Sequence, residues 1–376
     1  MITYHNIHEW VAQTQRGAVL DSKAVRGLFP YLAEATYLNT AATGLSWTGQ
    51  GAAAARFYDE DKSRGYGGRE QWRGKLQRTR ELVSGLLGVD PQEVSFASST
   101  TEVLNLLAHS VPLKSGDEVV LCADEFPSVI LAWSPAALRG AELVTVPVTS
   151  ERSRTDELIG GITRSTRVVC VSHVHWCTGT RVDLDRIASA ARAVGAKVVV
   201  DGAHALGAID VDASVADFYT GSTFKWLLSG FGVAYSMMRQ RAAAEIEPVF
   251  RGYANEAPSR SLQYSHANYP VMYALEATLE LLEGLGWQAI EARVSSLTET
   301  VHRGLVAAGW EVVTPMESRA GIISIRDPNA PQTVARLLAE RVEVEDRAGH
   351  LRVSPHFYNN EADLRRFLDV LGRNPG

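Results

Sequence analysis

Residues 197–226 read KVVVDGAHALGAIDVDASVADFYTGSTFKW and contain two β-rich segments, each followed by a side chain that can do chemistry. The first, Lys197–Asp201, is almost continuously apolar until its final aspartate, as is typical of a strand covered on both faces of a parallel sheet. The second, Ala216–Ser222, ends three residues before Lys225. We therefore predict two buried strands whose ends carry Asp201 and Lys225.

Alternating strands and helices are predicted on both sides of this segment. The clearest helix has apolar residues spaced three and four apart and stops at Gly195; these residues are Leu184, Ile187, Ala191 and Val194. Five more β-rich segments bring the expected strands to seven: residues 93–97, 118–122, 142–148, 167–174 and 232–238. Strands that alternate with crossover helices predict an α/β fold with a mostly parallel seven-stranded sheet.

The sequence pattern changes near residue 265. A long helical stretch, VMYALEATLELLEGLGW at residues 271–287, leads into shorter strand-like and helical segments that are typical of a smaller α+β unit. The chain of 376 residues also exceeds the roughly 250–300 residues at which one hydrophobic core usually stops growing. We predict a large domain at residues 31–264, a small C-terminal domain at 265–376, and an N-terminal segment, 1–30, that packs with the small domain.

Composition argues against several classes of protein. With 37 basic and 43 acidic residues the formal net charge is -6, whereas a protein that binds nucleic acid is expected to carry a basic surplus. There is no apolar run of about 18 residues and no secretory signal pattern, so we expect a cytoplasmic protein without a membrane partner. Three cysteines without a C-x-x-C spacing predict neither a disulfide scaffold nor a zinc ribbon, and no metal site is expected.

The residues that follow the strands indicate a cofactor. Ligands of parallel α/β sheets bind beyond the carboxyl ends of the strands, which is where Asp201 and Lys225 are predicted to lie. Pyridoxal phosphate needs a lysine amine for a Schiff base and a carboxylate against its ring nitrogen. Lys225 is also flanked by Phe224 and by the apolar residues 226–228, a setting in which burial would lower the pKa of its amine.

A third strand end offers a place for the phosphate. The segment Ser98–Glu102 follows the predicted strand at residues 93–97 and begins a predicted helix, whose first N–H groups suit a dianion. Taken singly, an aspartate at such a place is an ordinary turn residue, a lysine is a surface residue, and Thr100 with Thr101 is a helix cap. Their arrival in order, each after its own strand, favours a pyridoxal phosphate site.

Seven stretches occur in the order of the blocks that mark a known family: YLNTAATGLSW, SFASSTTEVLNLL, GDEVVLCADEFPSVILAW, SHVHWCTGTRVDLDRI, VVVDGAHALGAIDV, DFYTGSTFKW and LRVSPHFYNN. They resemble class V aminotransferase-fold enzymes, which are fold-type I pyridoxal phosphate proteins, from about Tyr37 to Leu371. The EFPS, DGAH and SPHFYN blocks look most like the branch of isopenicillin N epimerase-like proteins and ergothioneine-type C–S lyases. The resemblance implies pyridoxal 5'-phosphate as cofactor, a small-molecule amino-acid substrate and a homodimer.

The resemblance also implies roles for individual residues. Lys225 forms the Schiff base and moves protons, Asp201 pairs with the ring nitrogen, and His204 lies near the ring hydroxyl. Arg352 clamps the substrate carboxylate, for which a bidentate guanidinium is well suited, and Asn39 contacts substrate. The residues implied to hold the phosphate are Thr100, Thr101 and Ser222.

Two positions and one missing thiol distinguish the chain from the cysteine desulfurases of this family. Phe126 stands where those enzymes stack a histidine on the cofactor ring, and Trp176 stands where they have an asparagine, so both are implied to contact the cofactor. Desulfurases accept sulfur on a cysteine just before the arginine block, but EVEDRAGHLRVSP has none. Cys122 and Cys170 fall within predicted strands as buried residues, and Cys177 lies in another block. The sequence therefore argues against a desulfurase.

Several reactions are open to such an enzyme. The main hypothesis is a C–S β-lyase, in which Lys225 takes the α-proton of an S-substituted L-cysteine, the sulfur group leaves, and pyruvate and ammonia are released. An alternative keeps this substrate and cofactor but aminotransfers, epimerises, or couples decarboxylation to oxidative deamination in secondary metabolism. A second alternative is a non-catalytic pyridoxal phosphate-binding scaffold, which the presence of Lys225, Asp201 and Arg352 disfavours.

Overall fold

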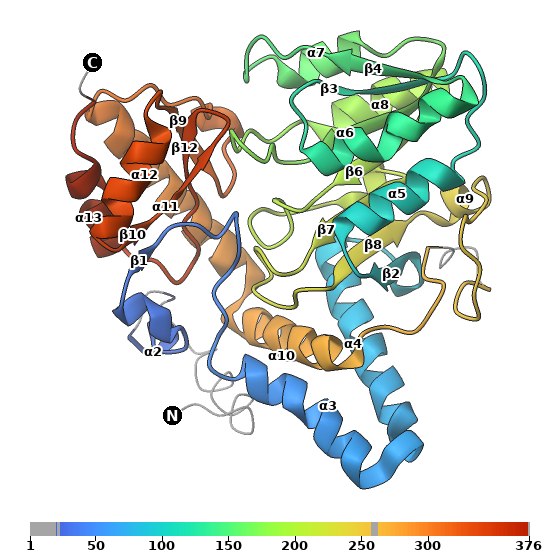
Figure 1. The fold of residues 1–376 in the computed structure, drawn as a ribbon, viewed down its shortest axis with the longest axis horizontal. Helices are drawn as coiled ribbons and strands as arrows, with labels where there is room; N and C mark the ends of the chain where they lie inside the picture. Colours follow the sequence, from blue (N-terminus) through green and yellow to red (C-terminus); the bar gives the residue numbers. More distant parts are fainter. Residues whose placement is uncertain (1–19, 21–22, 257–261, 375–376) are drawn as a thin grey trace.

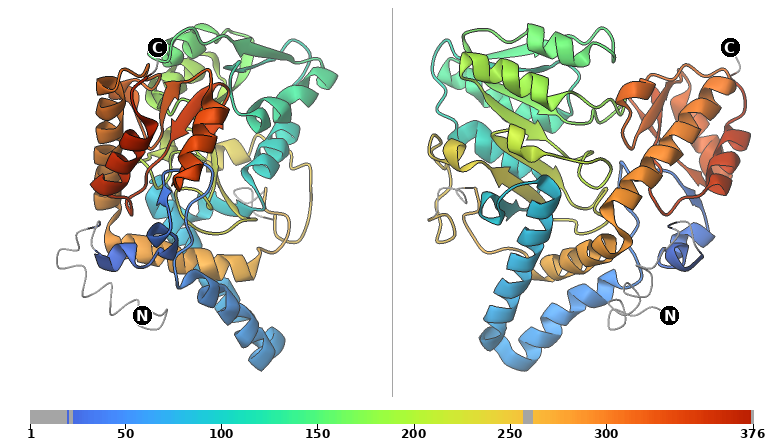
Figure 2. Two further views of the ribbon diagram at one scale, coloured as in Figure 1. Left: turned by 60° about the vertical axis from the view of Figure 1, so that its left-hand side comes forward. Right: turned by 180° about the vertical axis from the view of Figure 1, so that it is seen from behind.

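The computed structural model describes residue 20 and residues 23–256 and 262–374. A large sheet with its helices lies beside a smaller group of helices and strands (Figures 1 and 2). Helices α10 (Tyr269–Leu285) and α11 (Trp287–Ala307) follow each other in the chain and lead from the first part to the second. Among the described residues, no helix is both long and apolar enough to cross a membrane.

The large sheet has seven strands in the described part of the chain. They are β2 (Val94–Ala97), β3 (Glu118–Cys122), β4 (Glu142–Val146), β5 (Thr166–Ser172), β6 (Lys197–Asp201), β7 (Phe218–Ser222) and β8 (Ala234–Met238). Their order across the sheet is β2-β8-β7-β6-β5-β3-β4. Strand β8 runs antiparallel to both of its neighbours and the other pairs are parallel, which confirms the predicted mostly parallel sheet.

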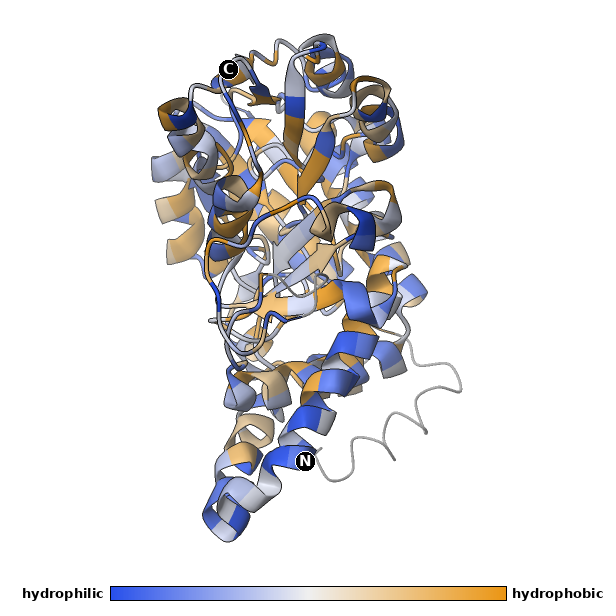
Figure 3. Cartoon of the chain, turned by 90° about the vertical axis from the view of Figure 1, so that its right-hand side faces the viewer, coloured by the Kyte–Doolittle hydropathy of each residue, from blue (hydrophilic) through white to orange (hydrophobic). Residues whose placement is uncertain are grey.

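Helices cover both faces of this sheet. They are α4 (Arg69–Leu87), α5 (Thr100–Ser110), α6 (Pro127–Trp133), α7 (Arg154–Gly160), α8 (Leu184–Val194) and α9 (Gln240–Ala243), together with α10, against which α3 (Gln50–Arg64) packs from outside. In β5, Val169 belongs to a core shared with α4, α8 and α10, whereas its neighbour Val168 faces the other way, into a core shared with α5 and α6. Because both faces are covered, the inner strands β3, β5 and β6 are mostly continuous apolar runs. Colouring by hydropathy shows the apolar strands inside and the polar outer faces of the helices (Figure 3).

The predicted helix that stops at Gly195 is α8. Leu184, Ile187 and Ala191 form its buried face, as their spacing indicates. Gly195 has a φ of 75°, a left-handed conformation that ends the helix and that glycine adopts without steric cost.

The C-terminal part is built on a three-stranded antiparallel sheet. Its strands are β9 (Ile323–Arg326), β11 (Glu345–Arg347) and β12 (His350–Val353), with β12 in the middle, and its helices are α12 (Ala330–Ala339) and α13 (Glu361–Leu371). A separate two-residue pair joins β1 (Thr36–Tyr37) to β10 (Val342–Glu343). The predicted long helical stretch ends sooner than its pattern indicated, because Gly286, with a φ of 90°, separates α10 from α11.

The described part of the N-terminal segment contacts the C-terminal part. Arg26, at the end of α2 (Lys23–Arg26), donates hydrogen bonds of 2.8 Å to the Tyr358 carbonyl oxygen and to the Asp363 carboxylate. Residues 1–19 lie outside the described residues. The domain boundaries at residues 30 and 264 stay predictions.

The sheet brings three strand ends together at one edge. In the register of the parallel strands, Ser172 of β5 lies beside Asp201 of β6, and Asp201 lies beside Thr220 of β7. Parallel neighbours end at the same edge, so the loops that follow β5, β6 and β7 all begin there. This edge is where the predicted site residues have to meet.

Replacing the helix cap Asn360 should destabilise the protein measurably. The Asn360 side chain accepts hydrogen bonds from the backbone N–H groups of Ala362 and Asp363 at the start of α13. We expect Asn360→Ala to lower the free energy of unfolding by about 1 kcal/mol in denaturant titration. Asn329→Ala is the matched control, because Asn329 precedes α12 without a side-chain cap. An equal loss in both variants would contradict the capping assignment.

Candidate active site

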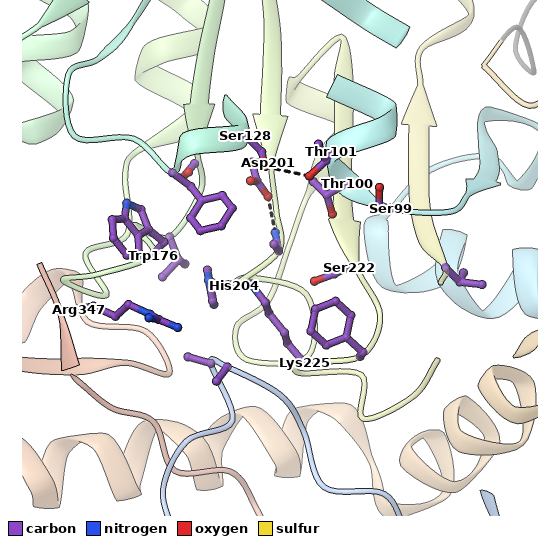
Figure 4. Close-up of a pocket in the computed structure, with 18 of the residues that line it drawn as sticks. Ser99, Thr100, Thr101, Ser128, Trp176, Asp201, His204, Ser222, Lys225 and Arg347 are labelled. Carbon is purple, nitrogen blue, oxygen red and sulfur yellow. Dashed lines mark hydrogen bonds between the residues drawn. The ribbon is translucent and has the colours of Figure 1, made fainter. Parts of the chain in front are cut away.

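A cavity of about 340 Å³ lies at the carboxyl edge of the large sheet (Figure 4). Nine of the ten residues proposed from the sequence line it: Thr100, Thr101, Phe126, Trp176, Asp201, His204, Ser222, Lys225 and Arg352. The tenth, Asn39, is not among the lining residues, although Ala41 and Ala42 of the same loop are. Its side-chain oxygen Oδ1 is buried and has no hydrogen-bond partner among the described residues.

Lys225 follows β7 and extends into the cavity beside His204 (Figure 4). Its Nζ lies 3.1 Å from His204 Nε2. Desolvation lowers the pKa of Lys225 to about 8, although the nearby Asp201 carboxylate opposes this shift. With this pKa about a tenth of the amine is neutral at pH 7 and about half at pH 8, far more than for an ordinary lysine, and the neutral form is the one that acts as a nucleophile or base.

His204 supports this neutral form of the amine. Its Nδ1 accepts a hydrogen bond of 3.4 Å from the Trp226 indole N–H, which can only donate. Burial holds the pKa of His204 well below its usual value, so the ring is neutral and its single proton lies on Nε2. That N–H then points at Lys225 Nζ and is best accepted by an unprotonated amine.

Asp201 is a buried carboxylate at the end of β6. Its Oδ1 accepts a hydrogen bond of 2.9 Å from the Ala203 N–H (Figure 4). Burial raises the pKa of Asp201, and the Ala203 bond and the Lys225 charge counteract this only in part. A cationic group placed against the carboxylate would relieve this cost, as a protonated pyridine nitrogen does.

Hydroxyl groups and a helix start form another end of the cavity. Thr100 Oγ1 and Ser222 Oγ are buried and have no hydrogen-bond partner among the described residues. The N-cap of α5 is Ser99, whose hydroxyl accepts from the Glu102 N–H, so Thr100 and Thr101 are the first helical residues. Unpartnered hydroxyls beside free helix N–H groups suit a phosphate, since buried polar groups are rarely left unpaired.

Two aromatic side chains form another wall of the cavity. Phe126 and Trp176 meet edge to face, with their ring centroids 5.6 Å apart. The Trp176 indole N–H donates to the Asp124 carbonyl oxygen at 3.0 Å, which fixes the ring. Phe126 is 39% exposed, so its ring has a free face for a planar ligand.

A buried arginine that no sequence motif marks braces this wall. Arg154 pairs with both Asp124 and Glu151, and its side chain is 2% exposed. Asp124, Glu151 and His175 lie close enough together to hold a metal ion, but the Arg154 guanidinium already donates hydrogen bonds to both carboxylates. The cluster is therefore an ion-pair network that holds the Asp124 carbonyl under Trp176.

Arg352 enters the cavity from β12. It donates to Glu345 at 2.6 Å and to the Trp176 carbonyl oxygen at 2.7 Å, and its Nε is buried without a partner among the described residues. Arg347 of β11 also lines the cavity and points into it (Figure 4), although sequence reasoning passed over it. The available signal was its spacing of two residues from Glu345, which places both side chains on one face of a strand.

Among the described residues, no cysteine lines this cavity. Cys122 and Cys170 are fully buried in their strands, as predicted. Cys177 contacts the Arg347 carbonyl oxygen at 3.3 Å, and burial raises the pKa of its thiol to about 11. Such a thiol is a poor nucleophile, which agrees with the argument against a desulfurase.

Comparison with known families decides the kind of site. Residues 36–367 match the family described as Aminotransferase class-V. The chain belongs to the class V aminotransferase family. It is a fold-type I enzyme that depends on pyridoxal phosphate, and its buried carboxylate, its amine of lowered pKa and its unpartnered hydroxyls fit that cofactor.

Relatives within the class V family differ in their reactions. The chain is 31% identical over 332 residues to isopenicillin N epimerase of Streptomyces clavuligerus, covering 79% of this chain and 83% of that protein. It is 26% identical to a probable cysteine desulfurase of Methanothermobacter thermautotrophicus, with the same coverage. The solved structure of the cystine C–S lyase C-DES with its product cysteine persulfide has a TM-score of 0.85 at 22% identity, covering 91% and 98% of the two chains. This last likeness shows the fold.

The reactivity of Lys225 should follow its lowered pKa. In the cofactor-free protein, we expect acetylation of Lys225 by acetic anhydride, followed by mass spectrometry, to rise as the pH passes through about 8, because only the neutral amine reacts. Asp201→Asn removes a negative charge that favours the protonated amine, so it should move the midpoint to lower pH. A midpoint near the ordinary value of 10.5 would contradict the desolvated setting.

Proposed function

We propose that the chain is a C–S β-lyase that converts an S-substituted L-cysteine and water to a thiol, pyruvate and ammonia. The observation that carries the proposal is the pairing of one amine of lowered pKa, Lys225, with a cavity in which no described residue offers a thiol. A lyase needs a base at the α-carbon and no sulfur acceptor, whereas a desulfurase needs that acceptor.

The proposed cofactor contacts follow the chemistry of each wall. When bound, pyridoxal phosphate supplies an aldehyde that links to amines and a ring that withdraws electrons from the substrate α-carbon. Asp201 would hold a proton on the ring nitrogen, and His204 would donate from Nε2 toward the ring hydroxyl or the amine. The remaining proposed cofactor contacts are Thr100, Thr101 and Ser222 at the phosphate and Phe126 and Trp176 against the ring.

Lys225 would act as the general base. A pKa of about 8 lets the amine take a proton near neutral pH and release it again without a large penalty. The departing sulfur needs no acid, because an ordinary thiol has a pKa of about 8.5 and leaves as a thiolate. Arg352 would orient the substrate through its α-carboxylate, using the Nε that has no partner among the described residues.

Epimerisation is the second candidate, favoured by the 31% identity to isopenicillin N epimerase of Streptomyces clavuligerus. Inverting a carbon centre requires protonation from the face opposite to proton removal. Among the described residues that line the cavity, Lys225 is the one with a pKa near neutrality, since the pKa of His204 is well below its usual range. Protonation of the α-carbon from the face opposite to Lys225 would therefore depend on water. Elimination needs no such second proton donor, so it is the simpler reaction for this cavity.

Two further reactions would use the same substrate. Aminotransfer, and decarboxylation coupled to oxidative deamination, both start from the same cysteinyl side arm and differ in which bond breaks. Homodimerisation, a role in secondary metabolism and substrate contact by Asn39 stay predictions from the resemblance, and a cytoplasmic location stays a prediction from the sequence composition.

Product analysis tests the reaction directly. We expect the cofactor-loaded protein to release pyruvate, ammonia and a thiol from S-substituted L-cysteines, as measured by mass spectrometry. Lys225→Ala should lose both this turnover and the visible absorbance band of the lysine-bound cofactor. A sulfur-retaining keto acid or aldehyde would identify aminotransfer or oxidative deamination, and recovery of the D-isomer would identify epimerisation.

Replacing Arg352 tests the assigned carboxylate contact. We expect Arg352→Ala to lower kcat/KM by an amount on the order of 2–4 kcal/mol while the cofactor absorbance band remains. Arg326→Ala is the control, because Arg326 lies on the neighbouring strand β9 and is exposed, with Glu311 as its partner. If kcat/KM is unchanged in Arg352→Ala, Arg352 does not bind the substrate.

A further inference from the structure

The β11–β12 hairpin presents three charged side chains on one face. Glu345 lies directly opposite Arg352 across the two strands, and Arg347 lies two residues after Glu345. Side chains two apart on a strand, and side chains opposite each other, share a face of the sheet. The opposite face carries Leu351, which belongs to the hydrophobic core of the C-terminal part.

One carboxylate is shared between the two guanidinium groups. Glu345 Oε2 accepts from Arg352 Nη2 at 2.6 Å, and Glu345 Oε1 accepts from Arg347 Nη2. The side chain of Arg352 is 3% exposed, that of Glu345 20%, and that of Arg347 44%. Two cations and one anion leave a single net positive charge beside the cavity, and both arginines line that cavity.

This charge matches a substrate with one anionic group. The α-carboxylate of an amino acid would neutralise the single surplus charge of the three side chains. A second carboxylate on the substrate would find the positive charge of both arginines already balanced, because the Glu345 carboxylate is hydrogen-bonded to both of them and the substrate α-carboxylate takes the surplus charge. Selectivity by an unfavourable charge of this kind is a common device in binding sites.

We propose that Glu345 sets the charge selectivity of the substrate site, so that the enzyme accepts S-substituted cysteines with uncharged S-substituents and disfavours those with a second carboxylate. The inference rests on the proposed function, because it takes such cysteine derivatives as the substrates. Glu345 acts through Arg347 and Arg352 and is a positioning and specificity residue.

The test compares two substrates of nearly equal shape, S-(carboxymethyl)-L-cysteine and its amide, S-(carbamoylmethyl)-L-cysteine. Binding to the cofactor-loaded enzyme is measured from the change in its absorbance spectrum, and pyruvate release is measured separately. We expect the native enzyme to prefer the amide. Glu345→Gln adds one positive charge with little change in shape, and it should shift the preference toward the carboxylate at least about tenfold, the factor that corresponds to about 1.4 kcal/mol.

Three further variants separate the effect of charge from general damage to the fold. Glu345→Gln combined with Arg347→Gln restores a single positive charge, so we expect it to return the preference to that of the native enzyme. Asp346→Asn makes the same change in net charge at the neighbouring residue, whose side chain points to the other face of β11, and it should leave the preference unchanged. If Glu345→Gln alone fails to fold because Arg352 loses its partner, Arg347→Gln still tests the charge, since it should weaken the binding of both substrates.

A second readout is the reactivity of Lys225. The Glu345 charge raises the pKa of Lys225, so Glu345→Gln should lower the pH midpoint of Lys225 acetylation, and Arg347→Gln should raise it. An unchanged substrate preference in folded Glu345→Gln overturns the inference, as does a failure of every variant to bind either substrate. Binding with the expected preference but without pyruvate would support the role of Glu345 and refute the lyase.

Discussion

The register of the parallel strands β5, β6 and β7 is the constraint on which the cavity depends. Backbone pairing sets Ser172 beside Asp201 and Asp201 beside Thr220, so the loops after β6 and β7 start next to each other. Little freedom is left in those loops, because a side chain at Gly202 would meet the Tyr219 ring at 2.0 Å. The 3.1 Å approach of Lys225 to His204 is thus a consequence of sheet geometry and tight backbone packing.

Burial of charge at this edge has a cost that a ligand can remove. Desolvation raises the pKa of Asp201 and lowers the pKa values of Lys225 and Arg352, so each group is disfavoured in its charged form. A cofactor with a cationic ring nitrogen and a reactive carbonyl would serve Asp201 and Lys225, and a substrate carboxylate would serve Arg352. The same desolvation that weakens the unliganded fold therefore favours binding, as is typical of functional sites.

Much of the fold, and the strand-end residues of the site, could be predicted because the signals are local. Apolar runs marked the seven strands, and Asp201 and Lys225 were found because each follows its own strand. Arg347 and Glu345 were missed because their importance depends on the hairpin register, which Ala348 and Gly349 fix through positive φ values of 49° and 76°. A shift of one residue would have turned Arg347 away from the cavity, and no sequence pattern reports that shift. The Arg154 network was missed for a related reason, since its partners come from separate loops.

The two ends of the cavity are controlled by different parts of the chain, and this bears on how reactions diverge within the family. Strand ends of the large sheet hold Asp201, Ser222 and Lys225, the groups that suit the cofactor. The substrate end depends on Arg352, whose guanidinium is oriented by Glu345 of the hairpin and by the Trp176 carbonyl of the large part. The Arg352 guanidinium is held in this orientation only when the hairpin and the large part of the chain are in contact. Changes at this contact can therefore alter which substrate is held, and which of its bonds faces Lys225, while the cofactor groups keep their places.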